Sequence, residues 1–218
     1  MPYCHCDAVQ HHFDASFVEV RRKRYKRQGP EVTTGILIDT LKSLDLRGAT
    51  MLDIGAGIGT LLREGFELGI DSATMVESSP AYLAAAKAEG KRLGHDDRVS
   101  YLGGDFVTLA QAGEISDASL VTLDRVVCCY PDMERLISES AAKCTQWYAV
   151  IYPSEFWYSK LDMACENFLR SRRGDPFRSF VHSEDRIDEI IREGGFERIF
   201  HKKTWMWRVS VYSSARTD

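Results

Sequence analysis

The chain has 218 residues, of which 44% are apolar and 28% charged, and its formal net charge is −4. This length suits one globular domain, and both fractions lie near the globular average, so a disordered chain, a collagen-like repeat and a disulfide-rich scaffold are excluded. We expect residues 1–218 to form a single domain.

No apolar run reaches the roughly 18 residues that a membrane span requires, and residues 1–14 lack the apolar core of a signal peptide. We therefore expect a cytoplasmic protein with reduced cysteines and no membrane partner. The cysteines show no C-x-x-C spacing that would indicate a zinc site. Cys4-His5-Cys6, with His11 and His12 nearby, is a candidate metal cluster. A frayed terminus is the preferred interpretation, so no metal is predicted.

The segment before the first strand is predicted to be helical. Asp7 followed by Gln10 resembles a capping box, which predicts a helix from about Asp7 to Lys26. A second helix is predicted over 31–44. Residues 1–45 would then form a helical lid over a site.

A basic run, RRKRYKR, occupies residues 21–27 and carries six positive charges. Removing these six from the net charge of −4 leaves −10 for the rest of the chain. A chain that is acidic elsewhere does not have the broad basic surface of a general nucleic-acid binder, so no nucleic-acid partner is expected. The run is either a solvated helix face or a collar for an anionic substrate, and the sequence leaves both interpretations open.

Short apolar runs alternate with helical stretches from Thr50 onward, which predicts a parallel sheet covered on both faces. Two β-rich runs at the end of the chain are too close for a crossover helix and must pair antiparallel. The predicted fold class is therefore α/β, doubly wound, with a terminal hairpin at one edge. Residues 153–182 are too long for an ordinary loop, and we expect this insertion to cover the acceptor site. The strands are predicted at 49–54, 73–77, 99–102, 119–124, 147–152, 196–202 and 204–212.

The sharpest motif is LDIGAGIGT, residues 52–60, which joins the first strand to a helix expected to start near Ile58. Its glycines permit a ligand to approach the backbone at a helix amino terminus. The dinucleotide fingerprint G-x-G-x-x-G has a different spacing, and a carboxylate at Asp53 would suit an ammonium group better than a pyrophosphate. Glu77 ends the second strand at the distance expected of an acid that accepts both ribose hydroxyls. A ribose and an ammonium together describe S-adenosylmethionine.

At these motifs the sequence resembles the class I S-adenosylmethionine-dependent methyltransferases, over about residues 31–213. The other matching motifs are the acid in MVESSP (75–80), GGDF (103–106) and LDRVVCCYPD (123–132). The resemblance implies a Rossmann-like, seven-stranded, mostly parallel sheet of order 3-2-1-4-5-7-6. It also implies S-adenosyl-L-methionine as the cofactor and methyl transfer as the activity.

The resemblance assigns a part of the cofactor to each motif. The first loop would hold the methionine end, Glu77 the ribose, and the GGDF motif the adenine. Asp105 could instead form a turn, and Phe106 could be core packing. The implied cofactor-binding residues are Asp53, Gly55, Ala56, Gly57, Gly59, Glu77, Ser78, Asp105, Phe106, Asp124, Arg125 and, in the lid, Thr33.

Methyl transfer is an in-line displacement that needs alignment and the exclusion of water, and a base is needed only for a protonated acceptor. The catalytic residues are unknown, and the candidates are Tyr25, Asp124, Tyr130 and His182. We expect a small-molecule acceptor, with a carboxylate or phosphate favoured by the basic run. Trp157 and Tyr158 are further candidates for its pocket, whereas Cys128-Cys129 are interpreted as buried, inert thiols.

Two alternatives stay open. The basic run could grip an RNA backbone, which would make the chain an RNA methyltransferase. The fold could also serve a non-catalytic, cofactor-binding subunit.

Overall fold

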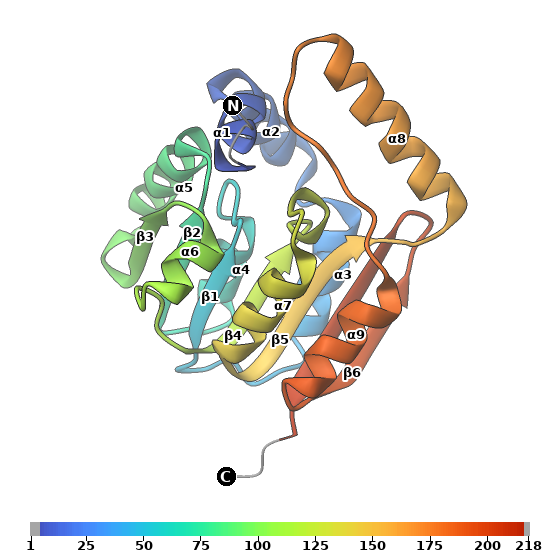
Figure 1. Ribbon diagram of the computed structural model, residues 1–218. Coiled ribbons are helices and arrows are strands. Elements are labelled where there is room, and N and C mark those ends of the chain that lie inside the picture. The colour runs from blue at the N-terminus through green and yellow to red at the C-terminus, as the bar shows by residue number, and fades with distance from the viewer. Residues whose placement is uncertain (1–4, 216–218) are drawn as a thin grey trace.

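The computed structural model describes residues 5–215 and contains one seven-stranded sheet (Figure 1). The sheet order is β3-β2-β1-β4-β5-β7-β6. Strands β1 to β5 are parallel, and β7 runs antiparallel to both of its neighbours. The predicted fold class and strand order are therefore confirmed. The strands are β1 (Thr50–Ile54), β2 (Ser72–Glu77), β3 (Val99–Gly103), β4 (Ala118–Asp124), β5 (Cys144–Pro153), β6 (Phe196–Lys203) and β7 (Trp207–Ser214).

Helices cover both faces of the sheet, because neighbouring side chains along each strand point to opposite faces. In β1, Leu52 and Ile54 pack with one group of helices, and Met51 packs with the other. The first group is α6 (Phe106–Gln111), α7 (Met133–Ala142) and α9 (Glu184–Glu193). The second group is α3 (Val32–Leu41), α4 (Thr60–Glu67) and α5 (Pro80–Leu93).

The amino-terminal segment forms two helices, so the prediction of one continuous helix from Asp7 to Lys26 was wrong. These helices are α1 (His5–His12) and α2 (Ala15–Gln28). Asp14 separates them, because its carboxylate accepts a hydrogen bond from the Phe17 amide and caps α2. Asp7 lies inside α1 rather than at its start. The predicted second helix is also shorter than expected and corresponds to α3.

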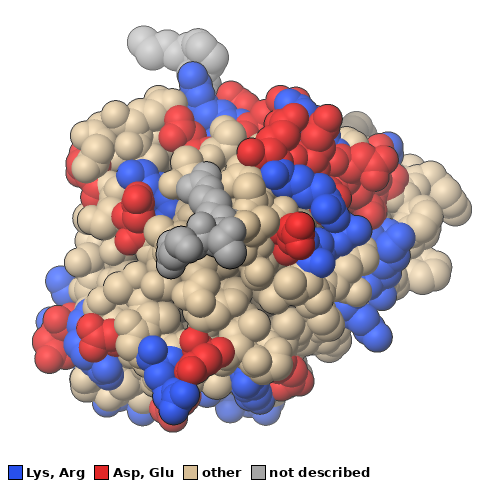
Figure 2. All heavy atoms as spheres, turned by 90° about the horizontal axis from the view of Figure 1, so that it is seen from below, with Lys and Arg blue, Asp and Glu red and all other residues tan. Residues whose placement is uncertain are grey.

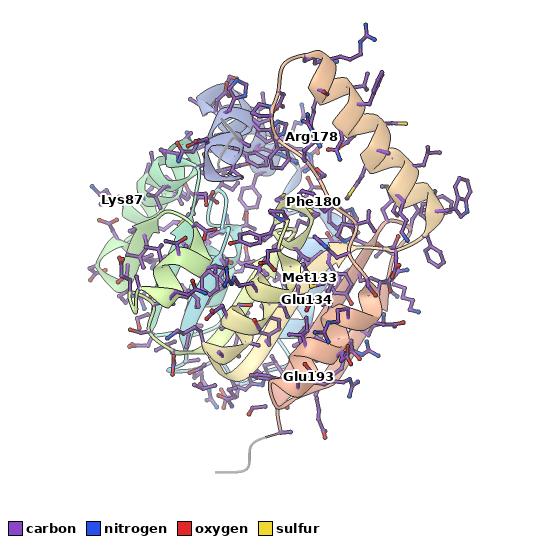
Figure 3. The ribbon with its side chains drawn as sticks, viewed as in Figure 1. Lys87, Met133, Glu134, Arg178, Phe180 and Glu193 are labelled. Carbon is purple, nitrogen blue, oxygen red and sulfur yellow. The ribbon has the colours of Figure 1, made fainter. Side chains whose placement is uncertain are left out.

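The predicted insertion at 153–182 contains a helix that the sequence did not indicate. This helix, α8 (Trp157–Arg172), lies at the outer edge of the molecule in Figure 1. The following segment returns past α2 toward α9, and Arg178 and Phe180 mark it in Figure 3. Helices α1, α2 and α8 thus lie beyond the carboxyl ends of the strands.

Figure 2 shows the opposite end of the molecule, where a group of acidic residues lies beside a band of basic residues at the upper right and uncharged residues cover much of the rest. Within residues 5–215, no helix is long and apolar enough to cross a bilayer. Cys4 and the side chains of His5 and Cys6, the first part of the candidate metal cluster, lie outside the described residues.

Candidate functional site

The first two parallel strands end side by side and bring the glycine loop beside an acid. In the register of the sheet, Ile54 pairs with Val76, which places Gly55 next to Glu77. The Gly55 amide extends this ladder by donating to the Val76 carbonyl at 2.8 Å. Gly55 and Glu77 are therefore neighbours in the sheet, although about twenty residues separate them in the sequence.

The glycine loop has a backbone that other residues would strain. Gly55 has φ +62°, and a Cβ there would lie 2.5 Å from a methyl group of Val126. Gly57 has φ +56°, and a Cβ there would make only an ordinary van der Waals contact, 3.8 Å from the Tyr82 ring. Gly55 is thus required by packing, whereas Gly57 leaves room for a ligand against the backbone. The helix that follows begins at Thr60, slightly later than predicted.

A cavity of about 590 Å³ lies between this loop and the three covering helices. Its floor is formed by the carboxyl ends of β1, β2 and β4 and the loops after them. Its cover is formed by α1, α2 and α8 and by residues 177 and 179 of the segment after α8. This volume lies within the range of roughly 300–1,000 Å³ that is usual for small-molecule sites.

Asp53 lies at the floor of the cavity and is only 1% exposed. Its Oδ1 accepts a hydrogen bond of 2.6 Å from the Thr122 hydroxyl. Its Oδ2 is buried and has no hydrogen-bond partner among the described residues. Burial raises the pKa of Asp53 to about 8, the Thr122 hydroxyl opposes this shift, and the nearby Asp124 and Glu77 carboxylates add to it. The side chain is therefore mostly protonated near neutral pH until a cation approaches.

Glu77 holds the glycine loop in place with both of its carboxylate oxygens. Oε2 accepts from the Gly57 amide at 2.9 Å, and Oε1 accepts from the Ser79 amide at 2.8 Å. Burial raises the pKa of Glu77, whereas these amides lower it. Each oxygen keeps a second lone pair, so the carboxylate can accept from a ligand without releasing the loop.

Tyr25 contributes a second unpaired polar atom. Its ring lines the cavity and lies 5.2 Å from the Arg63 guanidinium. Its hydroxyl is buried without a hydrogen-bond partner among the described residues. In the described part of the chain, three buried side-chain oxygens lack a partner, and two of them, on Tyr25 and Asp53, line this cavity. Buried polar atoms are usually paired, so this concentration indicates a polar ligand.

Known proteins resemble this chain in sequence over part of its length and in structure over nearly all of it. No family model matches the chain. The chain is 35% identical over 71 residues to a ribosomal protein L11 methyltransferase from Vibrio vulnificus, a stretch that covers 33% of this chain and 24% of that protein. The match thus spans about a quarter of the length of this curated relative.

Solved structures match over nearly the whole chain. Magnesium protoporphyrin IX methyltransferase from Synechocystis PCC 6803, with bound SAH, has a TM-score of 0.74 and 16% identity, over 97% of this chain and 100% of that one. A chain from the complex between the Trm112 methyltransferase activator of Haloferax volcanii and a putative methyltransferase has a TM-score of 0.71 and 16% identity, over 96% and 99%. The chain has the class I methyltransferase fold.

Within this class I fold, the loop after β3 carries the residues predicted to contact adenine. Asp105 caps α6, and its Oδ1 accepts from both the amide and the hydroxyl of Thr108. Phe106 lines the cavity and also belongs to the apolar core. Ser78 donates to the Gly104 carbonyl and joins this loop to the end of β2. Asp105 thus has a local structural role at the start of α6, as its alternative interpretation expected. Phe106 packs in the core, as its alternative interpretation expected, and also lines the cavity.

Asp124, at the end of β4, is held by two partners. The Thr34 hydroxyl donates to its Oδ2 at 2.6 Å, and the Arg125 Nε donates to its Oδ1 at 3.1 Å. Arg125 has φ +59°, a left-handed conformation that is unusual for a residue other than glycine. Of the two threonines expected in the lid, Thr34 therefore connects α3 to the site, and the cavity lining includes Thr34 but not Thr33. Gly59 is also outside the lining.

The basic run is partly paired with glutamates. Arg21 and Arg24, which line the cavity, both pair with Glu31, and Arg125 lies 3.6 Å from the same glutamate. Arg22 and Lys23 pair with Glu19. Four of the six positive charges thus share two carboxylates, so the run keeps a net positive charge, and the structure leaves both interpretations of the run open.

The remaining catalytic candidates lie in different surroundings. The cavity lining includes Tyr130 but not His182. The His182 Nε2 lies 3.0 Å from the Tyr130 carbonyl oxygen, and burial lowers the pKa of this histidine. Trp157 and Tyr158 lie outside the lining as well, at the start of α8.

The adjacent cysteines lie in the cavity wall, with 3.6 Å between the sulfur atoms of Cys128 and Cys129. The hydrogen bond with Cys129, together with burial, raises the pKa of the Cys128 thiol well above its usual value. Cys128 is therefore a neutral thiol and a poor nucleophile. This agrees with its interpretation as inert. Among the described residues, no group of three metal-ligating side chains occurs.

The cover contains residues that the sequence did not single out as part of the site. His12 Nδ1 lies 2.6 Å from Asp175 Oδ2, which joins α1 to the segment after α8. The His12 ring stacks on Phe177 at 4.4 Å, and Phe13 contacts the same ring edge to face at 5.2 Å. His12, Phe13, Phe17 and Phe177 all line the cavity. The apolar spacing of Phe13 and Phe17 was the available signal, but it does not reveal what these side chains face.

Proposed function

We propose that this chain binds S-adenosyl-L-methionine in the cavity and transfers its methyl group to a small, largely apolar acceptor. The observation that carries this proposal is the pair of unpaired buried oxygens, on Asp53 and Tyr25, in a cavity with a glycine cradle and an acid at the second strand end. A zwitterionic amino-acid group supplies a partner for each oxygen, because its ammonium donates to a carboxylate and its carboxylate accepts from a hydroxyl.

In this assignment the methionine end of the cofactor lies over the first loop. The ammonium group pairs with Asp53 Oδ2, and the carboxylate accepts from the Tyr25 hydroxyl. Gly57 has no side chain, and a Cβ there would contact only the Tyr82 ring, which supports close approach of the ligand to the backbone. Gly55 and Ala56 complete this part of the lining.

The nucleoside end lies over the second and third strand ends. Glu77 accepts from the ribose hydroxyls with the lone pairs that its amide partners leave free. Asp105 accepts from the adenine amino group through Oδ2, since both of its protein partners bind Oδ1. Phe106 packs against the ring, with Ser78 holding the loop.

When bound, the nucleoside supplies an electrophilic methyl group on a sulfonium. The chain's own task is to hold the acceptor in line and to exclude water. Asp124 acts here as a positioning residue rather than as a base, because both of its oxygens already accept hydrogen bonds from Thr34 and Arg125. These bonds fix the β4 end, where Arg125 and Val126 form part of the cavity wall.

The cover supports an apolar or aromatic acceptor. Its cavity side presents Phe13, Phe17, Met163 and Phe177, and the start of β7 adds Trp207, whereas Arg21 and Arg24 of α2 both pair with Glu31. The similar proteins include one enzyme named for a small-molecule acceptor, magnesium protoporphyrin IX, and one named for a protein acceptor, ribosomal protein L11. The apolar side chains on the cavity side of the cover favour the small molecule.

Calorimetry tests the cofactor assignment. S-adenosylmethionine and S-adenosylhomocysteine should both bind, and NAD should not. Tyr25→Phe removes only the hydroxyl and should weaken binding of both nucleosides by about tenfold, the usual scale for a hydrogen bond to a charged group. Tyr158→Phe is the matched control, because Tyr158 lies outside the cavity lining. Equal affinity in all three proteins would contradict the assignment of Tyr25.

Transfer from methyl-labelled cofactor to fractionated cell extract tests the activity. Label in an apolar metabolite fraction is the expected result. Label in RNA, lost when Lys26 and Arg27 are neutralised, would favour an RNA methyltransferase instead. Binding of the cofactor without label in any fraction would favour a non-catalytic subunit.

A further inference from the structure

Helix α8 exposes an apolar surface on the side that faces away from the cavity. At 100° per residue, Trp157, Leu161, Cys165 and Phe168 fall within an arc of about 80°. Ser159 and Met163 are the buried residues of this helix, and they lie on the opposite side. In Figure 1 no other element lies beyond α8 at this edge of the molecule.

The surface continues onto the turn between β6 and β7. Tyr158 stacks on Trp205 at 4.6 Å and on Phe156 at 5.5 Å, which joins this turn to the start of α8. We call this surface the α8 outer face. It contains six of the nine large apolar side chains that are exposed in the described part of the chain, namely Phe156, Trp157, Leu161, Phe168, Leu169 and Trp205.

The exposure of these side chains is high. Trp157 and Trp205 are each 74% exposed, and Phe168 is 60% exposed. The three other exposed apolar residues, Val20, Val32 and Ile199, lie in three different elements. Single apolar residues are normal on a protein surface, but a contiguous group of this kind indicates a binding surface.

The charges at the carboxyl end of the α8 outer face are positive. Arg172 lies within the apolar arc, with its guanidinium 5.8 Å from the Phe168 ring, and Arg173 follows at the end of the helix. The acids of α8, Asp162 and Glu166, both line the cavity, and Glu155, which precedes Phe156, pairs with Lys160. Trp, Phe and Leu on one helix face, with arginines at its end, is the pattern of a helix that lies in a membrane interface.

We propose that the chain binds the surface of an anionic lipid bilayer through the α8 outer face. In this arrangement α8 lies parallel to the membrane plane, the aromatic and leucine side chains enter the headgroup region, and Arg172 and Arg173 contact lipid phosphates. The expectation of no membrane partner rests only on the absence of a spanning segment, and a helix that lies on the surface of a bilayer needs no such segment. The proposal concerns attachment alone and does not depend on the cofactor or the reaction.

Flotation of the purified chain with vesicles tests this proposal. The chain should float with vesicles of phosphatidylcholine mixed with phosphatidylglycerol, and less with phosphatidylcholine alone. Leu161→Ser with Phe168→Ser should reduce the partition coefficient at least about tenfold, because each exchange removes one large apolar anchor. Arg172→Gln with Arg173→Gln should abolish the preference for phosphatidylglycerol.

Val32→Ser with Ile199→Ser is the matched control, because it removes two exposed apolar side chains elsewhere. This control should float like the wild type, and all variants should retain the wild-type melting temperature. Failure to float with either vesicle, or an equal loss in the control, would overturn the proposal. A dimer in solution that dissociates in the Leu161→Ser, Phe168→Ser variant would also overturn it, since a second copy would then be the occupant.

Discussion

Asp53 provides the sharpest test of how the cavity binds a ligand. Its carboxyl is buried and its pKa is raised to about 8. A ligand ammonium next to Oδ2 stabilises the ionised form, so binding should release the proton that the unliganded protein holds. Asp53→Asn keeps the shape of the side chain and its contact with Thr122 but cannot release a proton.

The size of this effect follows from the pKa. For a carboxyl with a pKa of about 8, the protonated fraction is about 0.9 at pH 7, about 0.5 at pH 8 and about 0.1 at pH 9. Binding of S-adenosylmethionine at pH 7 should therefore release up to about 0.9 proton from this site. Calorimetry in buffers with different ionisation enthalpies gives the number released. The amino group of the ligand also titrates near this range, so the informative quantity is the wild-type value minus that of Asp53→Asn.

The same shift predicts an opposite effect on stability. The pKa of Asp53 is raised above the value of 3.8 for an unfolded chain, so its contribution to stability is present at low pH and declines as pH rises toward 8. At about 1.4 kcal/mol per pH unit, the wild type should lose up to about 4 kcal/mol relative to Asp53→Asn between pH 5 and pH 8. Asp53→Asn should thus be more stable without ligand and bind it more weakly. A variant with unchanged proton release and unchanged affinity would refute the placement of the ammonium.

Three further predictions concern the surroundings of the cavity. Glu77→Gln should lower the free energy of unfolding by about 1–3 kcal/mol, because one loop amide loses its acceptor, and should weaken cofactor binding at least about tenfold. Urea titration measures the stability and calorimetry the affinity, and an unchanged affinity would contradict the ribose role. Burial acts to raise the pKa of Asp175, but the Phe177 amide and His12 hold this pKa below the usual 3.8. The stabilising contribution of Asp175 is therefore lost as pH falls below that value. Melting curves of Asp175→Asn should show a weaker dependence on acid pH than those of the wild type. Arg208→Met leaves the partly exposed Glu184 without its buried partner and should cost about 2–3 kcal/mol without changing cofactor affinity in the folded protein, whereas a large loss of affinity would mean that this pair shapes the site.

The floor of the cavity was predictable because it depends on local patterns. Each floor residue follows a short apolar run, and parallel strands bring their carboxyl ends to one edge. The order of Asp53, Glu77 and Asp124 along the chain therefore already fixed their proximity once the sheet order was known. The glycine at position 55 also has a reason within the protein, because its packing against Val126 leaves no space for a side chain.

The cover was less predictable because long-range contacts determine it. A helical period continues from α1 into α2, and only the capping bond of Asp14 reveals the break. Helix α8 buries little of its surface, so its apolar positions face outward and do not mark a core. His12 and Asp175 are 163 residues apart, and no spacing rule connects them. His182, which was predicted to line the acceptor pocket from the end of the insertion, instead lies against the Tyr130 carbonyl outside the cavity lining.

This division between floor and cover has a consequence for how an acceptor enters. The strands of the floor are joined by a continuous ladder of hydrogen bonds, whereas the two halves of the cover meet through His12, Asp175 and the rings of Phe13 and Phe177. Separating α1 from the segment after α8 breaks these few contacts and leaves the sheet intact, so the cover is the part that can open at low cost. Under the proposed function, substitutions in α1, in α8 or in the segment after α8 should then change the acceptor without disturbing the proposed cofactor residues, of which Tyr25 in α2 is the one that belongs to the cover. The identity of the acceptor therefore depends on the segments whose positions the sequence indicates least.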